Sequence, residues 1–139
     1  DSGYAWIQIT VADAEKLPFP DSYFDAITIA FGLRNMTNKD CALTECHRVL
    51  KPGGILVILE FSKTNYPLLK RAYSFYQQSW PIAGQLIAGD SAPYRYLIES
   101  IDVHPNQLEL NCIITDAGFR EVRYENLLGG LVAIHRAEK

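Results

Sequence analysis

Two apolar, β-rich runs most constrain how this chain can fold. The first is Phe24 to Phe31 (FDAITIAF), which is nearly continuously apolar after Asp25, and the second is Ile55 to Phe61 (ILVILEF). Runs of this kind are typical of strands buried on both faces, which favours a parallel sheet. A helical segment lies between them, and a strand–helix–strand crossover is almost always right-handed. The chain is therefore predicted to be an α/β protein.

The crossover helix is predicted over Asn38 to Leu50. Thr37 or Asn38 can cap its first turn. The sequence Lys51-Pro52-Gly53-Gly54 is expected to end it, because proline cannot continue a helix and glycine accepts the left-handed exit. The inward side is predicted from helical spacing and consists of Cys41, Leu43, Cys46, Val49 and Leu50.

Local patterns predict the remaining elements. We expect a strand over Trp6 to Val11 and a turn region over Ala12 to Asp21. Helices are expected within Pro67 to Ala88, as two helices broken near Pro81, after a turn within Asp90 to Ser100, as one short helix, and over Pro105 to Ala117. Two strands, Glu121 to Leu127 and Leu131 to His135, should form a hairpin around Leu128-Gly129-Gly130.

Composition narrows the classes of function. The formal charge is −3 at pH 7, and the basic stripe of a nucleic-acid-binding protein is missing, so no nucleic-acid partner is expected. The longest strongly apolar run, Gly54 to Phe61, is far shorter than the ~20 residues of a membrane span. Cys41, Cys46 and Cys112 follow no metal-ligand or disulfide spacing, which favours reduced thiols and no metal site.

Short motifs spread along the chain carry a family signature. They are DAEKLPFPDSYFD, FGLRN, RVLKPGG, LEFSK, PYRYLIESI with a following His-Pro, DAGF and a terminal VAIHR. Together they resemble the ubiquinone/menaquinone biosynthesis C-methyltransferase family over essentially all 139 residues. Motifs like LKPGG and LPFPD occur in many class I methyltransferases, whereas FGLRN, the YRYL-ESI segment and VAIHR are much more specific.

The resemblance implies a fold and an activity. The fold is a three-layer, Rossmann-like class I methyltransferase sheet that ends in an antiparallel hairpin. The activity is methyl transfer from S-adenosylmethionine to a ring carbon of a polyprenylated benzoquinol or naphthoquinol. The family's first two strands and Gly-rich cofactor loop have no counterpart here. Residues 1–139 are therefore expected to be the C-terminal part of a single methyltransferase domain, with an aromatic helical insertion at about 67–100, and to be inactive alone.

The resemblance also assigns cofactor-binding residues. Asp13 and Ala14 match the pair that reads adenine, through a carboxylate and a main-chain N–H, and Leu17 would cover the ring face. Ala30 stands near the methionine part of the cofactor, where only its backbone carbonyl can serve. The alternative for Asp13 is that it caps the helical turn Ala14 to Lys16.

Reactive groups are expected where the Phe24–Phe31 strand ends. Arg34 and Asn35 are the catalytic candidates: Arg34 would stabilise a phenolate through an ordered water, which makes the ring carbon more nucleophilic. The alternative is an ion pair that closes the loop. Glu60 interrupts an apolar strand, so it either pairs with Arg34 or faces the substrate pocket. His104 is a further candidate base, although a capping or surface histidine is the commoner case.

Aromatic and polar side chains further along the chain are expected to bind the substrate. These candidates are Phe31, Glu60, Tyr94, Tyr96 and Ser100, and Phe31 is equally suited to the core. The aromatic stretch Tyr73 to Trp80 either forms a lid or tunnel for the polyprenyl tail or simply covers the sheet.

These expectations define partners and a geometric test. The partners are a lipid-tailed quinol, a peripheral membrane contact, a second copy through exposed sheet edges, and a quinone-biosynthesis complex. The expected location is the bacterial cytoplasm, at the inner membrane if peripheral, with the mitochondrial matrix as the alternative. A non-catalytic binding module and a methyltransferase for another phenolic or acidic substrate remain alternatives. Asp13 and Arg34 should lie side by side.

Overall fold

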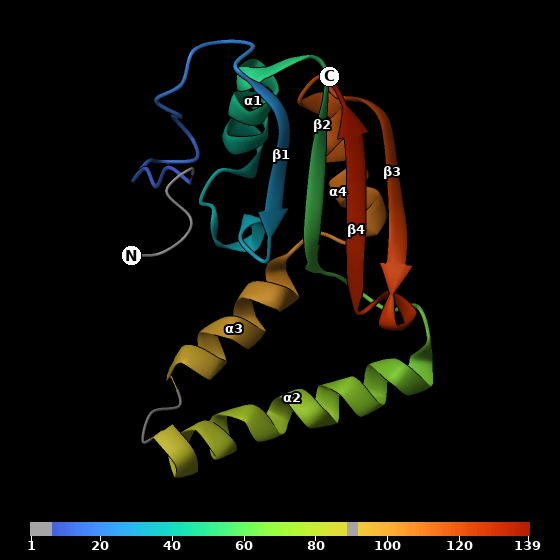
Figure 1. Ribbon diagram of the computed structural model, residues 1–139. Helices are drawn as coiled ribbons and strands as arrows, with labels where there is room; N and C mark the ends of the chain where they lie inside the picture. The colour runs from blue at the N-terminus through green and yellow to red at the C-terminus, as the bar shows by residue number, and fades with distance from the viewer. Residues whose placement is uncertain (1–6, 89–91) are drawn as a thin grey trace.

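The computed structural model describes residues 7–88 and 92–139 and is built around one four-stranded sheet. Its strands are β1 (Phe24–Ala30), β2 (Leu50–Phe61), β3 (Arg120–Leu127) and β4 (Val132–Glu138), in the spatial order β1-β2-β4-β3 (Figure 1). β1 and β2 pair in parallel, whereas β4 is antiparallel to both β2 and β3. This arrangement confirms the α/β class and the closing hairpin.

Helix α1 (Lys39–Val49) is the crossover between the parallel strands. The Asn38 side chain caps it by accepting a 3.0 Å hydrogen bond from the Cys41 N–H, as the sequence predicted. Cys41 itself is exposed and not part of the inward face, whereas Leu43, Cys46 and Val49 are buried. The prediction failed at Cys41 because the buried face of the helix runs through Ala42, Leu43, Cys46 and Val49, which leaves Cys41 on the outward side.

The helix ends within one residue of the predicted end at Leu50, but Lys51-Pro52-Gly53-Gly54 does not form a separate helix stop, because these residues already belong to β2. The helix ends at Val49, and Leu50 is extended (φ −72°, ψ 142°). Gly53 takes φ +76°, and its N–H donates to the Lys139 carbonyl at 3.0 Å. The glycine conformation was thus read correctly as left-handed, but it serves an irregular strand start instead of a helix end.

Helices α1 and α4 (Gln107–Asp116) pack together on one face of the sheet (Figure 1). Asn106 and Glu109 form a capping box that starts α4, which therefore begins two residues later than predicted. The core between these helices and the sheet contains Leu33, Leu43, Cys46, Leu50, Leu56, Ile58, Leu110, Ile114, Phe119 and Ala137. On the opposite face Ile55, Val57 and Leu59 are only partly buried.

Strand β1 is an edge strand, which corrects the expectation that it is buried on both faces. Phe24, Ile27 and Ile29 are partly buried, and the residues between them are exposed. Within the described chain only β2 pairs with β1, so the apolar side chains of β1 are less buried than their sequence would allow. The pattern signalled a buried parallel strand because it reports what the sequence can bury, not what is present to cover it.

Helices α2 (Pro67–Ala88) and α3 (Ala92–Val103) lie beyond the carboxyl ends of β1 and β2 (Figure 1). The predicted break at Pro81 does not occur, since α2 runs through it. Trp80 packs edge-on against Tyr73 and Tyr76, at 6.3 and 5.4 Å between ring centroids, and these contacts support the turn before the proline. Residues 89–91, where the Asp90–Ser100 turn was expected, lie outside the described chain.

The strand predicted over Trp6 to Val11 is also wrong: residues 7–12 form neither helix nor strand. Ile9 and Val11 are 93% and 99% exposed. Trp6 lies outside the described residues. A β-branched run becomes a strand only where another strand pairs with it, and β1 does not pair with this segment.

The predicted C-terminal hairpin is confirmed. Its strands are β3 and β4, with Leu127 opposite Val132, and the short helix η2 (Leu128–Gly130) forms the turn. Gly129 takes φ +67° and Gly130 φ +90°, which glycine adopts at little cost. β4 runs past the predicted end at His135 to Glu138 because it pairs with β2 along its full length.

Candidate functional site

The candidate site is at the carboxyl ends of β1 and β2, where open α/β sheets keep their ligand crevice. β1 stops at Ala30, and the Phe31 N–H still donates to the Leu59 carbonyl at 2.8 Å. Phe31 then takes φ +51°, a conformation that is costly for a bulky side chain. The strained residue turns the chain into the short helix η1 (Leu33–Asn35), which carries Arg34 and Asn35.

Arg34 and Glu60 form a buried ion pair in this crevice. The Arg34 Nη1 donates to Glu60 Oε1 at 3.0 Å, and the Arg34 backbone N–H donates to Glu60 Oε2 at 3.2 Å. The two side chains are 11% and 1% exposed. The structure therefore shows the pairing alternative for Glu60, with both carboxylate oxygens engaged.

Aromatic rings hold the Arg34 guanidinium from the other side. Its carbon lies 5.3 Å from the centre of the Phe61 ring, which in turn contacts Phe31 at 4.9 Å between centroids. Arg34 Nη1 also donates to the Phe31 carbonyl. The Arg34 Nε is buried and has no hydrogen-bond partner among the described residues. The guanidinium is thus a fixed cation whose buried Nε–H is still available to a ligand or water.

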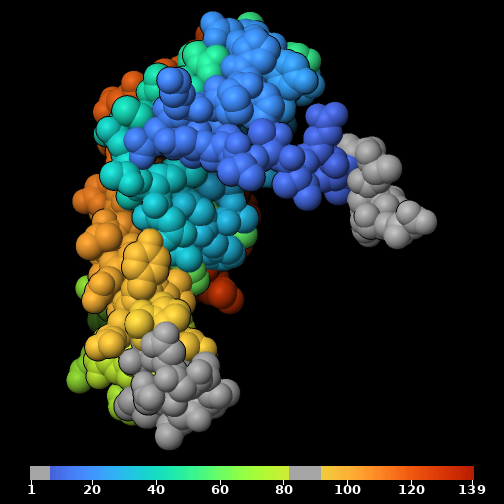
Figure 2. Space-filling model, turned by 90° about the vertical axis from the view of Figure 1, so that its left-hand side faces the viewer, coloured from blue at the N-terminus to red at the C-terminus, as the bar shows by residue number. Residues whose placement is uncertain are grey.

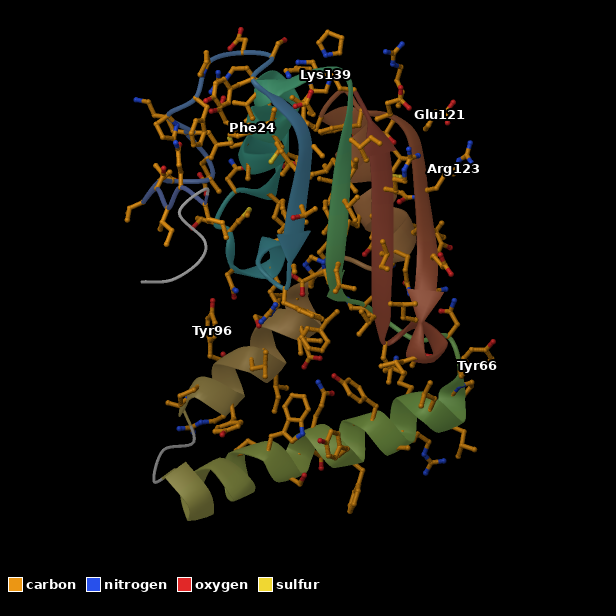
Figure 3. All side chains as sticks on the ribbon, viewed as in Figure 1. Phe24, Tyr66, Tyr96, Glu121, Arg123 and Lys139 are labelled. Carbon is orange, nitrogen blue, oxygen red and sulfur yellow. The ribbon has the colours of Figure 1, made fainter. Side chains whose placement is uncertain are left out.

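Tyr96 of α3 brings this helix onto the site. Its hydroxyl donates to the Asn35 side-chain carbonyl at 3.1 Å, and Figure 3 shows Tyr96 projecting from α3 toward the end of β1. Tyr94, on the same helix, is 36% exposed. Ser100 is buried and donates to the Leu97 carbonyl of its own helix at 2.8 Å. Tyr96 therefore hydrogen-bonds to a catalytic candidate, Asn35, whereas the Ser100 hydroxyl hydrogen-bonds within its own helix.

His104 is fully buried just after α3, at 1% exposure. Neither ring nitrogen has a hydrogen-bond partner in the described part of the chain. Burial, followed by the positive charge of Lys39 and smaller contributions from His135, Arg34 and Lys63, lowers the pKa of His104 to about 4. The ring is accordingly neutral at neutral pH, and the surface and capping alternatives for this histidine do not apply.

The acidic turn expected to read adenine lies on the molecular surface beside η1 and α1 (Figure 2). Asp13 Oδ1 accepts from the Glu15 N–H at 2.9 Å, and the Asp13 carbonyl accepts from the Lys16 N–H at 3.1 Å. The capping alternative for Asp13 is thus present in the structure. Its second carboxylate oxygen and the Ala14 N–H take part in no hydrogen bond among the described residues.

Arg48 fastens the rest of this loop to α1. It donates to the carbonyls of Leu17 and Phe19 at 3.1 and 2.9 Å and to the carboxylates of Asp21 and Glu45 at 2.7 Å. Glu45 Oε2 in turn accepts from the Leu17 N–H at 2.8 Å. Arg48, as hydrogen-bond donor and nearby cation, lowers the pKa of Glu45 to about 2. Sequence reasoning missed both residues, since a charged pair on a helix looks like a solvated face.

The two halves of the predicted site come near each other without touching. Glu15 accepts from the Asn38 N–H at 2.8 Å, which places the Asp13 turn at the start of α1, three residues after Asn35. Asp13 and Arg34 make no direct contact. Ala30 is exposed at the end of β1. The Asp13 turn therefore lies beside the start of α1, and Arg34 and Asn35 lie on η1, which precedes α1 in the chain.

Sequence reasoning also missed a cavity of about 340 Å³ between β2, α2 and α3. Polar residues that follow β2, Ser62 to Thr64, form one wall, and residues of α2 form another. The signal was in the sequence, because polar side chains directly after an apolar strand tend to line a crevice. Among the described residues no group of His, Cys, Asp and Glu side chains is arranged to hold a metal ion.

Comparison with known sequences gives a match over the whole chain. The sequence model of the ubiE/COQ5 methyltransferase family matches residues 1–139. A ubiquinone/menaquinone biosynthesis C-methyltransferase UbiE from Ectopseudomonas mendocina is 55% identical over 141 residues, which cover 100% of this chain and 55% of that protein. The protein of the same name from Chromobacterium violaceum is 56% identical over 134 residues, covering 96% and 54%. The chain spans about half the length of these relatives.

Solved structures share the fold at low sequence identity. A methyltransferase from Thermotoga maritima, described as S-adenosylmethionine-dependent and a possible histamine N-methyltransferase, aligns with a TM-score of 0.63 at 20% identity, over 91% of this chain and 61% of its own. An S-adenosylmethionine-dependent methyltransferase from Archaeoglobus fulgidus gives 0.64 at 16%, over 94% and 66%. The four-stranded sheet thus corresponds to part of a class I methyltransferase domain.

Proposed function

Since this chain belongs to the ubiE/COQ5 methyltransferase family, we propose that it forms the acceptor-binding part of an enzyme that methylates a ring carbon of a polyprenylated benzoquinol or naphthoquinol. The observation that carries the proposal is the family match over all of residues 1–139, at 55% identity to a named quinone-biosynthesis C-methyltransferase. The methyl donor is S-adenosylmethionine, whose sulfonium supplies an electrophilic methyl group when bound.

The acidic turn fits the adenine of this cofactor. The second oxygen of the Asp13 carboxylate can accept from an exocyclic amine, and the Ala14 N–H can donate to the neighbouring ring nitrogen. Leu17 is partly buried beside them and can cover the ring. Ala30 contributes its backbone at the strand end.

Arg34 and Asn35 prepare the acceptor for reaction. A quinol ring carbon becomes a better nucleophile when its hydroxyl loses a proton or hydrogen-bonds to a base. The Arg34 guanidinium, fixed by Glu60 and Phe61, stabilises the resulting phenolate directly or through a water on its buried Nε. Asn35, bonded to Tyr96, orients the hydroxyl. Glu60 acts as a positioning residue, because its oxygens are occupied by Arg34 and the Phe61 N–H.

The acceptor ring is bordered by Phe31, Tyr94 and Tyr96, with Ser100 and His104 deeper in the fold. His104 is the candidate to accept the ring proton after methyl transfer, although burial lowers its pKa and so makes it a weaker base than a free histidine. The polyprenyl tail would extend from the acceptor ring along the aromatic face of α2, around Tyr73 and Trp80.

The test is a chimera in which residues 1–139 replace the matching segment of the Ectopseudomonas mendocina relative. The chimera should transfer labelled methyl from S-adenosylmethionine to demethylmenaquinol or to the matching benzoquinol. Arg34→Gln should lower kcat about 100-fold with little change in KM, as expected for a group that acts in the transition state. Arg123→Gln, a surface arginine on β3, is the matched control. No label in either quinol would reject the proposal.

The 139-residue chain alone is proposed to be inactive. It offers only the adenine corner to the cofactor, so titration calorimetry with S-adenosylhomocysteine should give no measurable heat of binding. Tight binding by the chain alone would contradict this.

Membrane contact and assembly belong to the same proposal. The quinol is lipid-tailed, and α2 exposes Leu68, Phe75 and Tyr76 toward solvent, a surface suited to a bilayer or to a quinone-biosynthesis complex. Within residues 7–88 and 92–139 no helix has the length and apolarity needed to span a membrane. A peripheral location on the cytoplasmic side of a bacterial inner membrane, or the matrix side in mitochondria, is consistent with this substrate.

One observation favours a second candidate function, a non-catalytic assembly module. The free edge of β1 offers unpaired backbone groups to a second chain. Light scattering after size exclusion distinguishes the two: a tight dimer with no cofactor affinity, even in the chimera, favours the module.

A further inference from the structure

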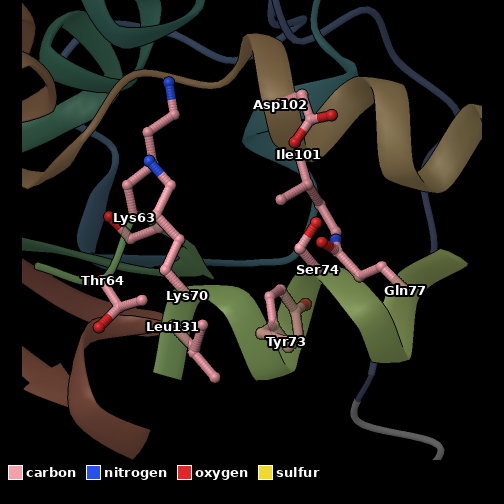
Figure 4. Close-up of a pocket in the computed structure, with 10 residues that line it drawn as sticks. Lys63, Thr64, Lys70, Tyr73, Ser74, Gln77, Ile101, Asp102 and Leu131 are labelled. Atoms are coloured by element: carbon pink, nitrogen blue, oxygen red, sulfur yellow. The ribbon is translucent and has the colours of Figure 1, made fainter. Parts of the chain in front are cut away.

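The cavity beyond the carboxyl end of β2 lies apart from the Arg34–Glu60 site. Its volume is about 340 Å³, and its walls come from the segment after β2, from α2 and from the end of α3 (Figure 4). None of Arg34, Asn35 and Glu60 lines it. Cavities of this size are in the range of small-ligand sites.

Two buried hydrogen-bonding groups line this cavity without a partner. Ser62 and Gln77 are each 8% exposed, and the Ser62 Oγ and Gln77 Nε2 have no hydrogen-bond partner among the described residues. They come from different elements, the β2 extension and α2. Buried donors are almost always paired in folded proteins, so these two groups are completed by ordered water or by a ligand.

The cavity is also rich in positive charge. Lys63 and Lys70 line it against a single carboxylate, Asp102, and Figure 4 shows the two lysines on the side opposite Gln77. Neither lysine forms an ion pair in the described structure. The lining residues carry two ammonium groups, one amide and the hydroxyls of Ser62, Thr64, Tyr73 and Ser74, of which Thr64 already donates to the Gly129 carbonyl. Such a set of donors suits a ligand with several acceptor oxygens.

We propose that this cavity binds a phosphate-type oxyanion. A tetrahedral anion presents acceptor oxygens in several directions at once and can therefore meet donors on separate walls. Lys63 and Lys70 balance the charge, Gln77 and Ser62 donate to two oxygens, and Asp102 accepts from a protonated oxygen or an adjoining hydroxyl. Leu131 and Ile101 leave room for a small apolar attachment. The site makes no use of methyl transfer and stands without the proposed function.

The first experiment is titration of the 139-residue chain with inorganic phosphate, followed by amide chemical shifts in nuclear magnetic resonance. Shifts should concentrate at Ser62 to Thr64 and at Tyr73 to Gln77. The double variant K63Q/K70Q should weaken binding about 100-fold and Gln77→Leu about tenfold. Lys51→Gln, at the other end of β2, is the control and should bind as the parent does.

Two results would overturn the proposal: no saturable shifts at these residues, or equal weakening by K51Q and K63Q/K70Q. Circular dichroism confirms that each variant is folded, and Lys70→Arg, which keeps the charge, should retain most of the binding.

A second arm identifies the source of the phosphate. Vesicles of phosphatidylglycerol, but not of phosphatidylcholine, should co-sediment with the chain if the ligand is a lipid head group, and K63Q/K70Q should abolish this. Saturable binding of inorganic phosphate without vesicle binding assigns the site to a free anion. Binding in neither arm rejects it.

Discussion

At the scale of single residues, the Arg34–Glu60 pair decides the geometry of the candidate site. Its members come from η1 and β2, and neither has another residue of opposite charge in contact. A buried charge without its partner is expensive, whereas the intact pair contributes little net stability. The pair is therefore best understood as a device that fixes Arg34 against Phe31 and Phe61.

Substitution of Glu60 by glutamine should destabilise the chain by about 3 kcal/mol, because it leaves the Arg34 cation buried without a counter-charge. Urea unfolding at pH 7 measures the change. Glu125→Gln, an exposed position on β3, should change the free energy of unfolding by less than about 0.5 kcal/mol. Equal stabilities for Glu60→Gln and the parent would show that solvent reaches the guanidinium.

Two buried histidines should make the chain sensitive to acid. Burial lowers the pKa values of His104 and His135 to about 4, from an ordinary value of 6.5. Above pH 6.5 both rings are neutral in the folded and unfolded states. Between pH 6.5 and pH 4 only the unfolded chain gains these protons, so stability falls as the pH is lowered.

Each histidine should remove about 2–3 kcal/mol of stability between pH 7 and pH 4.5. His104→Met should flatten the pH dependence by that amount, as measured by urea unfolding at both pH values. His135→Gln keeps the bond to Asn111 within reach and should act similarly. A His104→Met variant with the full parental pH dependence would contradict the assignment.

At the scale of elements, the sequence offered Thr37 or Asn38 as the cap of α1 but named no cap for α4, which it started at Pro105. Asn38 before Lys39 and Asn106 before Gln107 are both caps in the structure. Asparagine at these positions has a local mechanism, a side-chain oxygen that accepts from the first turn, and needs no knowledge of the rest of the fold.

Replacing Asn38 by alanine should cost about 1 kcal/mol of unfolding free energy, because the Cys41 N–H loses its acceptor. Chemical unfolding of the 139-residue chain measures this loss. The neighbouring Thr37→Ala is the control, since Thr37 is exposed and accepts no capping bond. A larger loss at Thr37 than at Asn38 would transfer the cap to the threonine.

Two element predictions failed for different reasons. The Trp6–Val11 run has strand composition, but within the described chain no strand pairs with it, and the sequence of the run does not record whether a partner is present. Pro81 should interrupt a helix, yet α2 continues through it, with Trp80 packed against Tyr73 and Tyr76 on the same helix.

At the scale of the whole molecule, the two edges of the sheet differ in chemistry. β3 carries the charged and polar residues of REVRYENL, which discourage pairing with another chain, whereas the β1 sequence FDAITIA is nearly apolar. Thr28 lies exposed in the middle of β1. The difference predicts that self-association, where it occurs, uses β1.

Thr28→Lys should suppress dimer formation, since it adds a charge to the free edge, whereas Glu125→Lys on β3 should leave it unchanged. Light scattering over a tenfold range of protein concentration gives the mass of each variant. A dimer that persists in Thr28→Lys but dissociates in Glu125→Lys would place the interface on β3 instead.

The fold was predicted more completely than the site. The β1–α1–β2 crossover and the β3–β4 hairpin follow from periodicity and turn residues, and the motifs supplied the family. For the site, the sequence proposed Arg34 and Asn35 because they follow a strand end, and the structure places both on η1, where they remain candidates. Ser62, Gln77 and the role of Arg48 were not predicted, because the role of an isolated polar residue depends on the residues that surround it in the fold.

Arg48 has one further consequence. The loop that presents Asp13 is fastened to the body largely by this guanidinium and its carboxylate partners, in contrast to the apolar packing that holds the sheet. Ion pairs at the surface weaken as the salt concentration rises. Single substitutions at Arg48 or its partners can therefore change how the loop is held without disturbing the core. The nucleoside binding proposed for the Asp13 loop and the stability of the sheet should therefore respond to different substitutions.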